Sequence, residues 1–276
     1  MIMRAALYNG QKSIEMTELP TPKAGENDIV VKNIYASICG TDVAVYEHGP
    51  GTGHRITVGS EFGHEMVSEV VQVGKNVKDI KLGDRGYPYP RLAKGDSKRA
   101  GTTGIAAAIA LKFFGCDKVM ICDVSDFRLN KAKELGFEIC NNGKEDIKAK
   151  AQKIFDGAVS ALGETCDVDI YIDAAGADGI IENYQSMGKI NSRMVVVAVK
   201  ARLRPIDVLA MTYGQHAIIG SGGYFPEDVR DVMAIMQSKN WDIESIITDV
   251  YPWEQLPQAI EKASKVNEAL NVIIKY

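Results

Sequence analysis

Residues 101–136, GTTGIAAAIALKFFGCDKVMICDVSDFRLNKAKELG, decide the fold. The small apolar residues of 105–114 predict a helix, and the short apolar run 119–122 predicts a strand that ends at Asp123. A second helical pattern follows over 128–135 and stops at a glycine. A helix, a strand and a helix in this order are typical of an α/β domain with a parallel sheet.

The start of the first helix has the chemistry of a dinucleotide site. Gly101 would let the backbone approach a pyrophosphate, and Gly104 would let the helix press closely on the sheet. Thr102 and Thr103 stand between these glycines, at a helix N-terminus whose free N–H groups attract anions. An acid at the end of the next strand, Asp123, would accept hydrogen bonds from a ribose diol and would repel a 2′-phosphate. We therefore expect NAD rather than NADP.

Four further residues are candidates for the same cofactor site. Asp126 adds negative charge that opposes a 2′-phosphate, and Arg128 follows it at the start of the second helix. Ala175 and Val197 lie near the ends of two further predicted strands. Parallel sheets bind their ligands along this carboxyl edge, so we expect both residues beside the cofactor.

The first strand of such a domain is missing from the sequence. A dinucleotide motif has three glycines after a buried strand, but Arg99 stands at the position of the first glycine. Residues 87–98 contain prolines and charges that a central parallel strand excludes. Either the protein has a deletion near 98–101, or the sequence is incomplete at this point. A sheet without its first strand would expose two unpaired edges, which favours the second explanation.

The composition excludes several classes of protein. The 276 residues have room for two domains, and a net charge of −4 without a basic run gives no reason to expect nucleic acid or an anionic membrane as a partner. No apolar stretch approaches the length of a membrane span, and the N-terminus lacks the apolar core of a signal peptide. Five widely spaced cysteines argue against a disulfide framework and favour a cytoplasmic location.

The rest of the chain divides by its pattern. Residues 1–98 read as short strands separated by Pro and Gly turns, which predicts an all-β region that is mostly a small barrel. From residue 101 to about 220, helices alternate with buried strands, which predicts a doubly wound parallel sheet. Its strand candidates are 118–122, 168–172, 194–199 and 217–219. The tail predicts two helices, at 226–237 and 253–264, and a last strand at 271–275 that rejoins the first domain.

One group of residues in the β region has the chemistry of a zinc site. Cys39 follows a predicted strand and His64 precedes another, and a catalytic zinc with such ligands keeps one position open for water or substrate. Thr41 could hydrogen-bond a bound hydroxyl group, and Asp42 could accept the far ring N–H of His64. His48 is a candidate for extending a proton path. The alternative is that Cys39 is a buried small hydrophobe and that both histidines are surface residues.

A set of motifs, taken together and in order, resembles the medium-chain, zinc-dependent alcohol and polyol dehydrogenases along nearly the whole chain. The motifs are 19-LPTP-22, 39-CGTD-42, 63-GHE-65, 73-VG-74, 83-GDR-85, 101-GTTG-104, Asp123 and 220-GSGGY-224. The resemblance implies a GroES-like β-barrel catalytic domain and a Rossmann dinucleotide-binding domain, with the active site between them. The expected boundaries are 1–98 with 224–276 for the catalytic domain and 99–223 for the Rossmann domain.

The same resemblance implies the chemistry. Cys39, His64 and Glu65 would bind one catalytic zinc, and Thr41 would take part in the proton relay. The likeness is greatest to sorbitol-, butanediol- and threonine-type members, which oxidise a secondary alcohol beside another polar group. We therefore expect NAD as cofactor, a small-molecule alcohol or polyol as substrate, and a homodimer or homotetramer.

The sequence departs from the family pattern at several places. Ser68 stands where the family has a glycine, and Gly86 stands where an apolar residue is expected. The cysteine cluster of the structural zinc site is absent, so we expect no structural zinc. The block missing near 98–101 would hold the rest of the catalytic domain and a further acidic residue near the metal. Two alternatives therefore stay open: a zinc-free reductase of the same superfamily, and a truncated, non-catalytic protein that binds a nucleotide.

Overall fold

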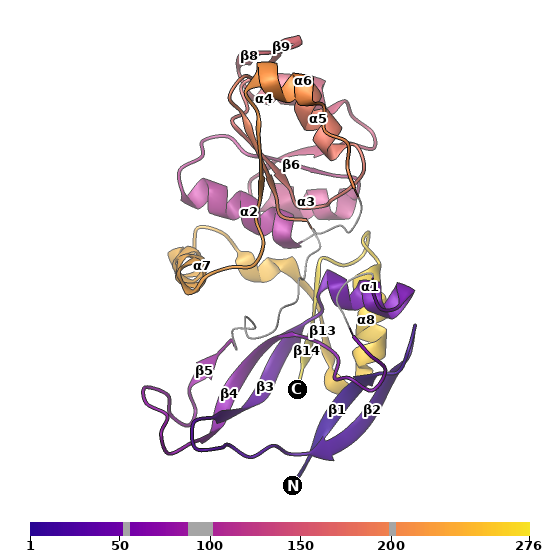
Figure 1. Cartoon of the computed structure of the whole chain (residues 1–276), viewed down its shortest axis with the longest axis vertical. Coiled ribbons are helices and arrows are strands. Elements are labelled where there is room, and N and C mark those ends of the chain that lie inside the picture. The colour runs from indigo at the N-terminus through magenta and orange to yellow at the C-terminus, as the bar shows by residue number, and fades with distance from the viewer. Residues whose placement is uncertain (52–55, 88–101, 199–202) are drawn as a thin grey trace. The chain divides into compact units, whose positions relative to one another are not determined.

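The computed structural model describes residues 1–51, 56–87, 102–198 and 203–276. Contacts within the chain divide it into two compact units, and each is described by itself (Figure 1). Unit 1 comprises Met1–Ser97, Ile247–Lys265 and Asn271–Tyr276, and unit 2 comprises Lys98–Ile246 and Val266–Leu270. The tail therefore returns to the N-terminal unit, except for the short segment Val266–Leu270.

Unit 1 is built on a five-stranded sheet with the strand order β13-β14-β3-β4-β5. Its strands are β3 (Ile29–Ser37), β4 (Glu65–Val73), β5 (Arg85–Gly86), β13 (Ile247–Pro252) and β14 (Asn271–Lys275). The pair β13–β14 is parallel, and the other three pairs are antiparallel. Two register shifts interrupt the β3–β4 ladder, one between Val30 and Val31 and one between Asn33 and Tyr35. Irregularities of this kind bend a sheet locally.

A hairpin and two helices complete unit 1. They are β1 (Ile2–Tyr8), β2 (Ile14–Pro20), α1 (Gly40–His48) and α8 (Leu256–Ser264), which follows the short 3-10 helix η3 (Trp253–Gln255). Val45 of α1 packs with Tyr8 and Ile56 in a small core, and α1 also contacts α8. The expectation that residues 1–98 form only β-structure is therefore wrong, because α1 has a buried face of its own.

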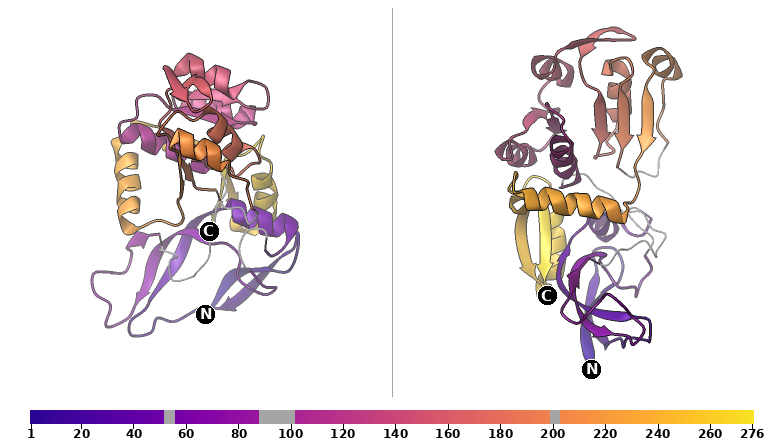
Figure 2. Two further views of the ribbon diagram at one scale, coloured as in Figure 1. Left: turned by 45° about the horizontal axis from the view of Figure 1, so that its top comes forward. Right: turned by 90° about the vertical axis from the view of Figure 1, so that its left-hand side faces the viewer.

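Unit 2 contains parallel strands and most of the helices. Its strands are β6 (Met120–Asp123), β7 (Glu138–Asn141), β8 (Gly157–Ser160), β9 (Gly163–Cys166), β10 (Ile170–Asp173), β11 (Arg193–Val196) and β12 (Ala217–Gly220). Its helices are α2 (Thr102–Phe113), α3 (Asp126–Glu134), α4 (Ile147–Ile154), α5 (Ile180–Met187), α6 (Val208–Gly214), α7 (Pro226–Ser238) and the 3-10 helix η2 (Ile243–Ile246). The strands β10, β11 and β12 form a parallel sheet and lie side by side in the right-hand view of Figure 2.

The core of unit 2 explains why α7 belongs to it. Ile105 and Ile109 of α2 pack with Ile235 of α7 and with Ile246 in one buried cluster. Burying each such side chain contributes roughly 1.5–3 kcal/mol. The division between the units therefore falls after η2, whereas the sequence suggested a boundary before α7, at residue 224.

The parallel sheet of unit 2 is split in two. The strands β6 and β7 form a separate two-stranded sheet, and within the described ranges no strand pairs with the other edge of β6 or joins it to β10. In a doubly wound sheet the first strand would stand at this point. Two unpaired strand edges follow, one along Met120–Asp123 and one along Ile170–Asp173, as expected for a sheet that lacks its first strand.

The sequence patterns located many of the elements and missed others. The predicted strand 271–275 coincides with β14, and the predicted helix 226–237 differs from α7 by one residue. The helices α1, α4, α5 and α6 and the hairpin β8–β9 were not predicted. Among the described residues, no helix combines the length and the apolar composition that a bilayer crossing requires.

Candidate metal site and nucleotide site

The pairing of β3 with β4 brings the candidate metal ligands together. Ser37, the last residue of β3, is the register partner of Glu65, the first residue of β4. Cys39 follows Ser37 by two residues and His64 directly precedes Glu65, so both lie at the same end of this strand pair. The ligand atoms of Cys39, His64 and Glu65 lie within 4.8 Å of one another.

Asp42 holds this cluster from the first turn of α1. The residue is 2% exposed, and its Oδ2 accepts a hydrogen bond from the backbone N–H of Cys39 at 3.0 Å. Its Oδ1 lies 3.2 Å from Nδ1 of His64. An acid in a first helical turn is stabilised by the helix dipole. The same carboxylate therefore caps the helix and orients the imidazole, which directs Nε2 away from Asp42.

Thr41 lies in the cluster, whereas His48 does not join it. The buried hydroxyl of Thr41 donates to Sγ of Cys39 at 3.2 Å, and the same oxygen lies 3.4 Å from Nε2 of His64. His48 is exposed at the last position of α1. It lies about 12 Å along the helix axis from Gly40, at about 1.5 Å per residue. The structure thus supports a place for Thr41 beside the ligands and gives His48 none.

The charges of the cluster depend on one another. Burial lowers the pKa of His64, but hydrogen bonds to Asp42 and Cys39 outweigh burial and raise that pKa to about 11. Burial raises the pKa of Glu65, and the neighbouring His64 opposes this shift. The surroundings therefore favour the protonated, positively charged form of His64 and the neutral form of Glu65.

This donor set fits zinc. A thiolate, an imidazole and a carboxylate are its usual protein ligands, and three of them leave a fourth position for water or substrate. Asp42 contacts the ring nitrogen of His64 that would not bind the metal. Carboxylates commonly contact metal-binding histidines in this way and fix the orientation and tautomer of the ring.

The candidate nucleotide residues of unit 2 begin at the end of β6. Oδ1 of Asp123 accepts a hydrogen bond from the backbone N–H of Ser125 at 2.9 Å. The hydroxyl of Ser125 caps α3 by accepting from the N–H of Arg128 at 3.4 Å, and it donates to the carbonyl of Val266 at 3.1 Å. Burial lowers the pKa of the Arg128 guanidinium, and the nearby charge of Asp123 opposes this shift. Asp123 and Arg128 therefore lie close enough for their charges to interact.

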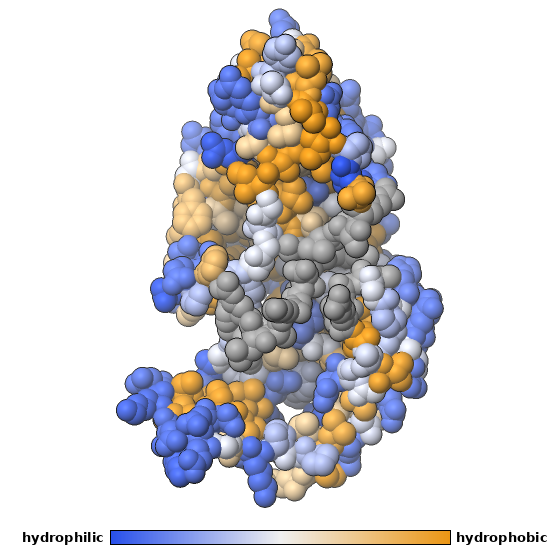
Figure 3. All heavy atoms as spheres, in the orientation of Figure 1, coloured by the Kyte–Doolittle hydropathy of each residue, from blue (hydrophilic) through white to orange (hydrophobic). Residues whose placement is uncertain are grey.

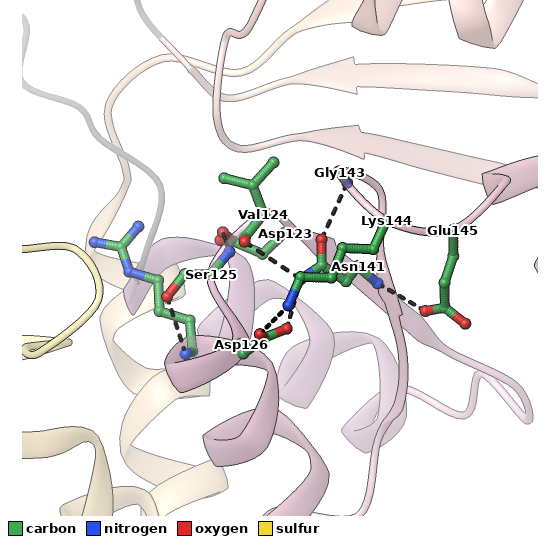
Figure 4. A network of polar contacts seen from close by, with 9 residues as sticks. Asp123, Val124, Ser125, Asp126, Asn141, Gly143, Lys144 and Glu145 are labelled. Carbon is green, nitrogen blue, oxygen red and sulfur yellow. Dashed lines mark hydrogen bonds and ion pairs between the residues drawn. The ribbon is translucent and has the colours of Figure 1, made fainter.

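The second acid of this region is already paired. Lys144 forms an ion pair with Asp126, and Nδ2 of Asn141 donates to the same carboxylate at 2.6 Å (Figure 4). These hydrogen bonds hold the pKa of Asp126 below its ordinary value. Because Lys144 balances its charge, Asp126 repels a 2′-phosphate less than the sequence suggested. The expected preference for NAD over NADP then depends mainly on Asp123.

Asp173, at the end of β10, organises the loops that contain two further candidates. Its Oδ1 accepts the N–H of Ala175 at 3.0 Å and that of Gly176 at 2.6 Å. Its carbonyl accepts the N–H groups of Val197 and Ala198, both at 2.9 Å. One buried acid therefore fixes the loops after both β10 and β11. Asp173 is not among the residues expected at the site, although an acid that ends a buried strand before small residues is a usable signal in the sequence.

The start of α2 is only partly described. The hydroxyl of Thr102 donates to the carbonyl of Leu270 at 3.3 Å, while Gly101 lies outside the described residues. A Cβ added at Gly104 would have Ala174 as its nearest described neighbour, at an ordinary 3.9 Å. Close packing of α2 on the described sheet therefore does not require glycine here, in contrast to the expectation from the sequence.

Two family models match the chain. One is described as an alcohol dehydrogenase GroES-like domain and matches residues 25–124. The other is described as a zinc-binding dehydrogenase and matches residues 102–238. The chain belongs to the medium-chain, zinc-type alcohol dehydrogenase family. Its membership confirms the resemblance and the fold class, a GroES-like domain together with a Rossmann domain.

Individual medium-chain dehydrogenases resemble the chain at low identity. L-threonine 3-dehydrogenase of Yersinia pestis (strain Pestoides F) is 22% identical over 91% of this chain and 93% of its own. The crystal structure of 2R,3R-butanediol dehydrogenase from Bacillus subtilis has a TM-score of 0.81 at 18% identity and covers both chains completely. A dehydrogenase structure from Sinorhizobium meliloti 1021, bound to NADP, has a TM-score of 0.79 at 16% identity and also covers both chains completely.

The alignment with the threonine dehydrogenase is longer than the chain itself. It spans 325 positions, whereas the chain has 276 residues. Since only 91% of the chain takes part, more than 70 positions of the alignment hold no residue of this chain. This medium-chain dehydrogenase therefore contains segments that have no counterpart here.

Proposed function

We propose that the chain is a zinc- and NAD-dependent oxidoreductase that oxidises a secondary alcohol, such as a polyol, sugar alcohol or diol, to a ketone by hydride transfer. The observation that carries the proposal is the clustering of Cys39, His64 and Glu65 within 4.8 Å. A thiolate, an imidazole and a carboxylate are the ligand types that bind zinc in proteins, and a three-residue set leaves one position open for water or substrate. In this proposal unit 1 is the catalytic domain and unit 2 binds the cofactor.

The residues of the site have separate tasks. Cys39, His64 and Glu65 would hold one zinc ion, which supplies Lewis-acid chemistry that makes a hydroxyl group more acidic. Asp42 keeps the ring of His64 in position. Thr41 places a hydroxyl group beside Cys39 and His64, where it can accept a proton and pass it on. His48 is exposed at the end of α1, so in this proposal it would act only on a proton that has already left the cluster.

The cofactor is proposed to bind along the carboxyl ends of the strands in unit 2. Asp123 and Arg128 would meet the adenosine ribose, and the loops of Ala175 and Val197 would line the same edge. The start of α2, with Gly101, Thr102, Thr103 and Gly104, would receive the pyrophosphate. The nicotinamide ring supplies the hydride chemistry, and the protein supplies position.

We also propose a homodimer or homotetramer without nucleic acid or membrane partners, working in the cytoplasm. Apolar side chains gather on the face of unit 2 over α6 and the segment that leads into it (Figure 3). Leu203 is 99% exposed there, Val208 71% and Leu209 67%. Patches of this kind usually lie in interfaces. The molar mass in solution tests this part of the proposal.

One observation favours a second candidate. The split between β6 and β10 interrupts the sheet that the cofactor needs, which supports a non-catalytic chain that keeps the metal site alone. A panel of secondary alcohols, including threonine and 2,3-butanediol, separates the two when it is combined with metal analysis. Zinc together with NADH formation supports the dehydrogenase. Zinc without turnover supports the second candidate, and turnover without zinc supports a zinc-free reductase.

A further inference from the structure

The loop after β10 is held at Gly176 from two sides. The N–H of Gly176 donates to Oδ1 of Asp173 at 2.6 Å, and its carbonyl accepts a hydrogen bond from Nη2 of Arg204 at 2.8 Å. Gly176 has a φ of +61°, in the left-handed region that favours glycine. Arg204 is therefore one of two side chains that fix this turn of the chain.

Arg204 contacts the same loop a second time. Its Nη1 forms an ion pair with Asp178, two residues after Gly176, and its side chain is only 16% exposed. A planar guanidinium can make two such contacts at once in a defined geometry, whereas the single ammonium group of lysine does not reproduce that fork. Arg204 therefore binds the loop at two points and restricts its shape more than one hydrogen bond would.

The backbone that carries Arg204 is itself anchored, three residues farther along, at Asp207. Nε2 of Gln185 donates to the carbonyl of Asp207 at 2.8 Å, and Oε1 of Gln185 accepts the N–H of Asp207 at 3.0 Å. Gln185 is 5% exposed and belongs to α5, the helix that follows the loop. Arg204 therefore reaches the loop from a segment that is fixed to the next helix, so its guanidinium needs little further ordering.

These contacts lie at the carboxyl ends of two neighbouring strands. The strands β10 and β11 are parallel partners, and Arg204 lies in the connection from β11 to α6. Asp173, at the end of β10, also binds the backbone N–H of Val197 after β11. Ligands of α/β sheets bind along this edge. Arg204 therefore links the loop of Ala175 to the connection that contains Val197, and both of these residues are candidates for the cofactor site.

We propose that Arg204 is a positioning residue for the nicotinamide cofactor. Through Gly176 and Asp178 it holds the loop after β10 in the conformation that the cofactor binds, and it acts without touching the cofactor. The inference rests on the proposed function, because it concerns the same cofactor site. When the guanidinium is lost, the loop adopts other conformations as well, and the apparent dissociation constant rises by the inverse of the fraction that stays competent.

Arg204→Met tests this role, because methionine keeps an unbranched stem and lacks the fork. If about one tenth of the loops stay competent, NADH should bind roughly tenfold more weakly. In turnover the KM for NAD should rise by the same factor while kcat stays constant, as for an interaction that stabilises ground state and transition state equally. Arg204→Lys should recover part of the affinity. Arg193→Met is the matched control and should bind NADH as wild type does, since Arg193 is exposed at the opposite end of β11.

Two further measurements separate positioning from a general loss of stability. Hydrogen exchange of the amides of residues 175–178 should become several-fold faster in Arg204→Met, whereas that of α5 should not change. Asp178→Asn should weaken NADH binding less than Arg204→Met, because the contact with the carbonyl of Gly176 remains. The double variant should bind NADH as Arg204→Met does, since both changes remove the same ion pair.

Three results would overturn the inference. The first is equal NADH affinity in Arg204→Met and wild type, and the second is an equal loss of affinity in Arg193→Met. The third is a wild-type chain that does not bind NADH, which would also remove the cofactor assignment. NADH binding that depends on Arg204, without any alcohol oxidation, would contradict the proposed function and leave the inference standing. Alcohol oxidation with the same KM for NAD in wild type and Arg204→Met would contradict the inference alone.

Discussion

His64 and Asp42 form the contact on which the candidate metal site depends: Nδ1 of the ring lies 3.2 Å from Oδ1 of the buried acid. Asp42 also caps α1 through its second oxygen and the N–H of Cys39. Asp42 therefore contacts two candidate ligands: His64, which directly precedes β4, and Cys39, which directly precedes α1. Disturbing it should affect the metal more than the fold.

Asp42→Asn should weaken zinc binding roughly 10- to 100-fold, the usual cost of losing a partner behind a metal ligand. The physical reason is that the amide no longer holds His64 through a negative charge. Competition with a zinc chelator measures the affinity. Asp228→Asn is the matched control, because Asp228 caps α7 in the same way, accepting the N–H of Phe225 at 2.6 Å, and lies apart from the cluster. Equal zinc affinity in wild type and Asp42→Asn would remove Asp42 from the site.

Asp123→Asn should weaken NADH binding roughly tenfold or more, because hydrogen bonds to a charged acceptor contribute about 1.5–3 kcal/mol. NADPH binding should stay constant or improve, since the repulsion of the 2′-phosphate is lost. Fluorescence titration with both cofactors measures the ratio. Asp126→Asn serves as comparison and should change the ratio less, because Lys144 already balances that charge. A larger effect at Asp126 would reverse the assignment.

Lys144→Met should raise the pKa of Asp126 toward its ordinary value, because the Lys144 hydrogen bond is the main cause of the lowered pKa. A carboxyl group whose pKa is lowered by folding stabilises the protein above its unfolded pKa, and this contribution disappears as pH falls through the folded pKa. The variant should therefore lose part of the acid dependence of unfolding. NMR titration of the carboxyl carbons measures the shift, with Lys150→Met as a neighbouring control that affects Glu145 instead. An unchanged titration of Asp126 would contradict the ion pair.

Gly104→Ala and Gly74→Ala should have opposite effects on stability. At Gly104 an added Cβ meets Ala174 at an ordinary 3.9 Å, so the helix should gain about 0.5–1 kcal/mol from alanine. At Gly74 the added Cβ would lie 2.2 Å from the carbonyl oxygen of Gly25, so alanine should cost about 1–3 kcal/mol or more. Urea unfolding measures both. Strong destabilisation by Gly104→Ala would restore the close helix–sheet contact expected from the sequence.

The sequence predicts the parts of this protein that follow a repeating pattern. Strand β14 and helix α7 were located almost to the residue, because their apolar periodicity and flanking residues are clear. The cluster of Cys39 and His64 was predicted from residue chemistry and family likeness, and the structure explains it by the register of Ser37 with Glu65.

Other features depend on tertiary contacts that no local pattern reports. The residue before helix α1 is Cys39, which is not one of the usual polar N-cap residues. The start of this helix therefore has no clear signal in the sequence, and the region is expected to be all-β. The pairing of Asp126 with Lys144 spans a loop, and sequence alone could not show that this acid is neutralised. Asp173 binds N–H groups from two loops, a role that appears only when β10 and β11 are side by side.

The most direct test of the central claim is the rate of NADH formation from a panel of secondary alcohols, measured on metal-free protein before and after one equivalent of zinc. The account predicts no turnover before zinc, turnover after it, and none in Cys39→Ala, which should still bind NADH. Cys116→Ala, which changes a cysteine of unit 2 outside the cluster, should behave as wild type. Turnover at the same rate without zinc, or in Cys39→Ala, would contradict the metal site on which the proposed function rests.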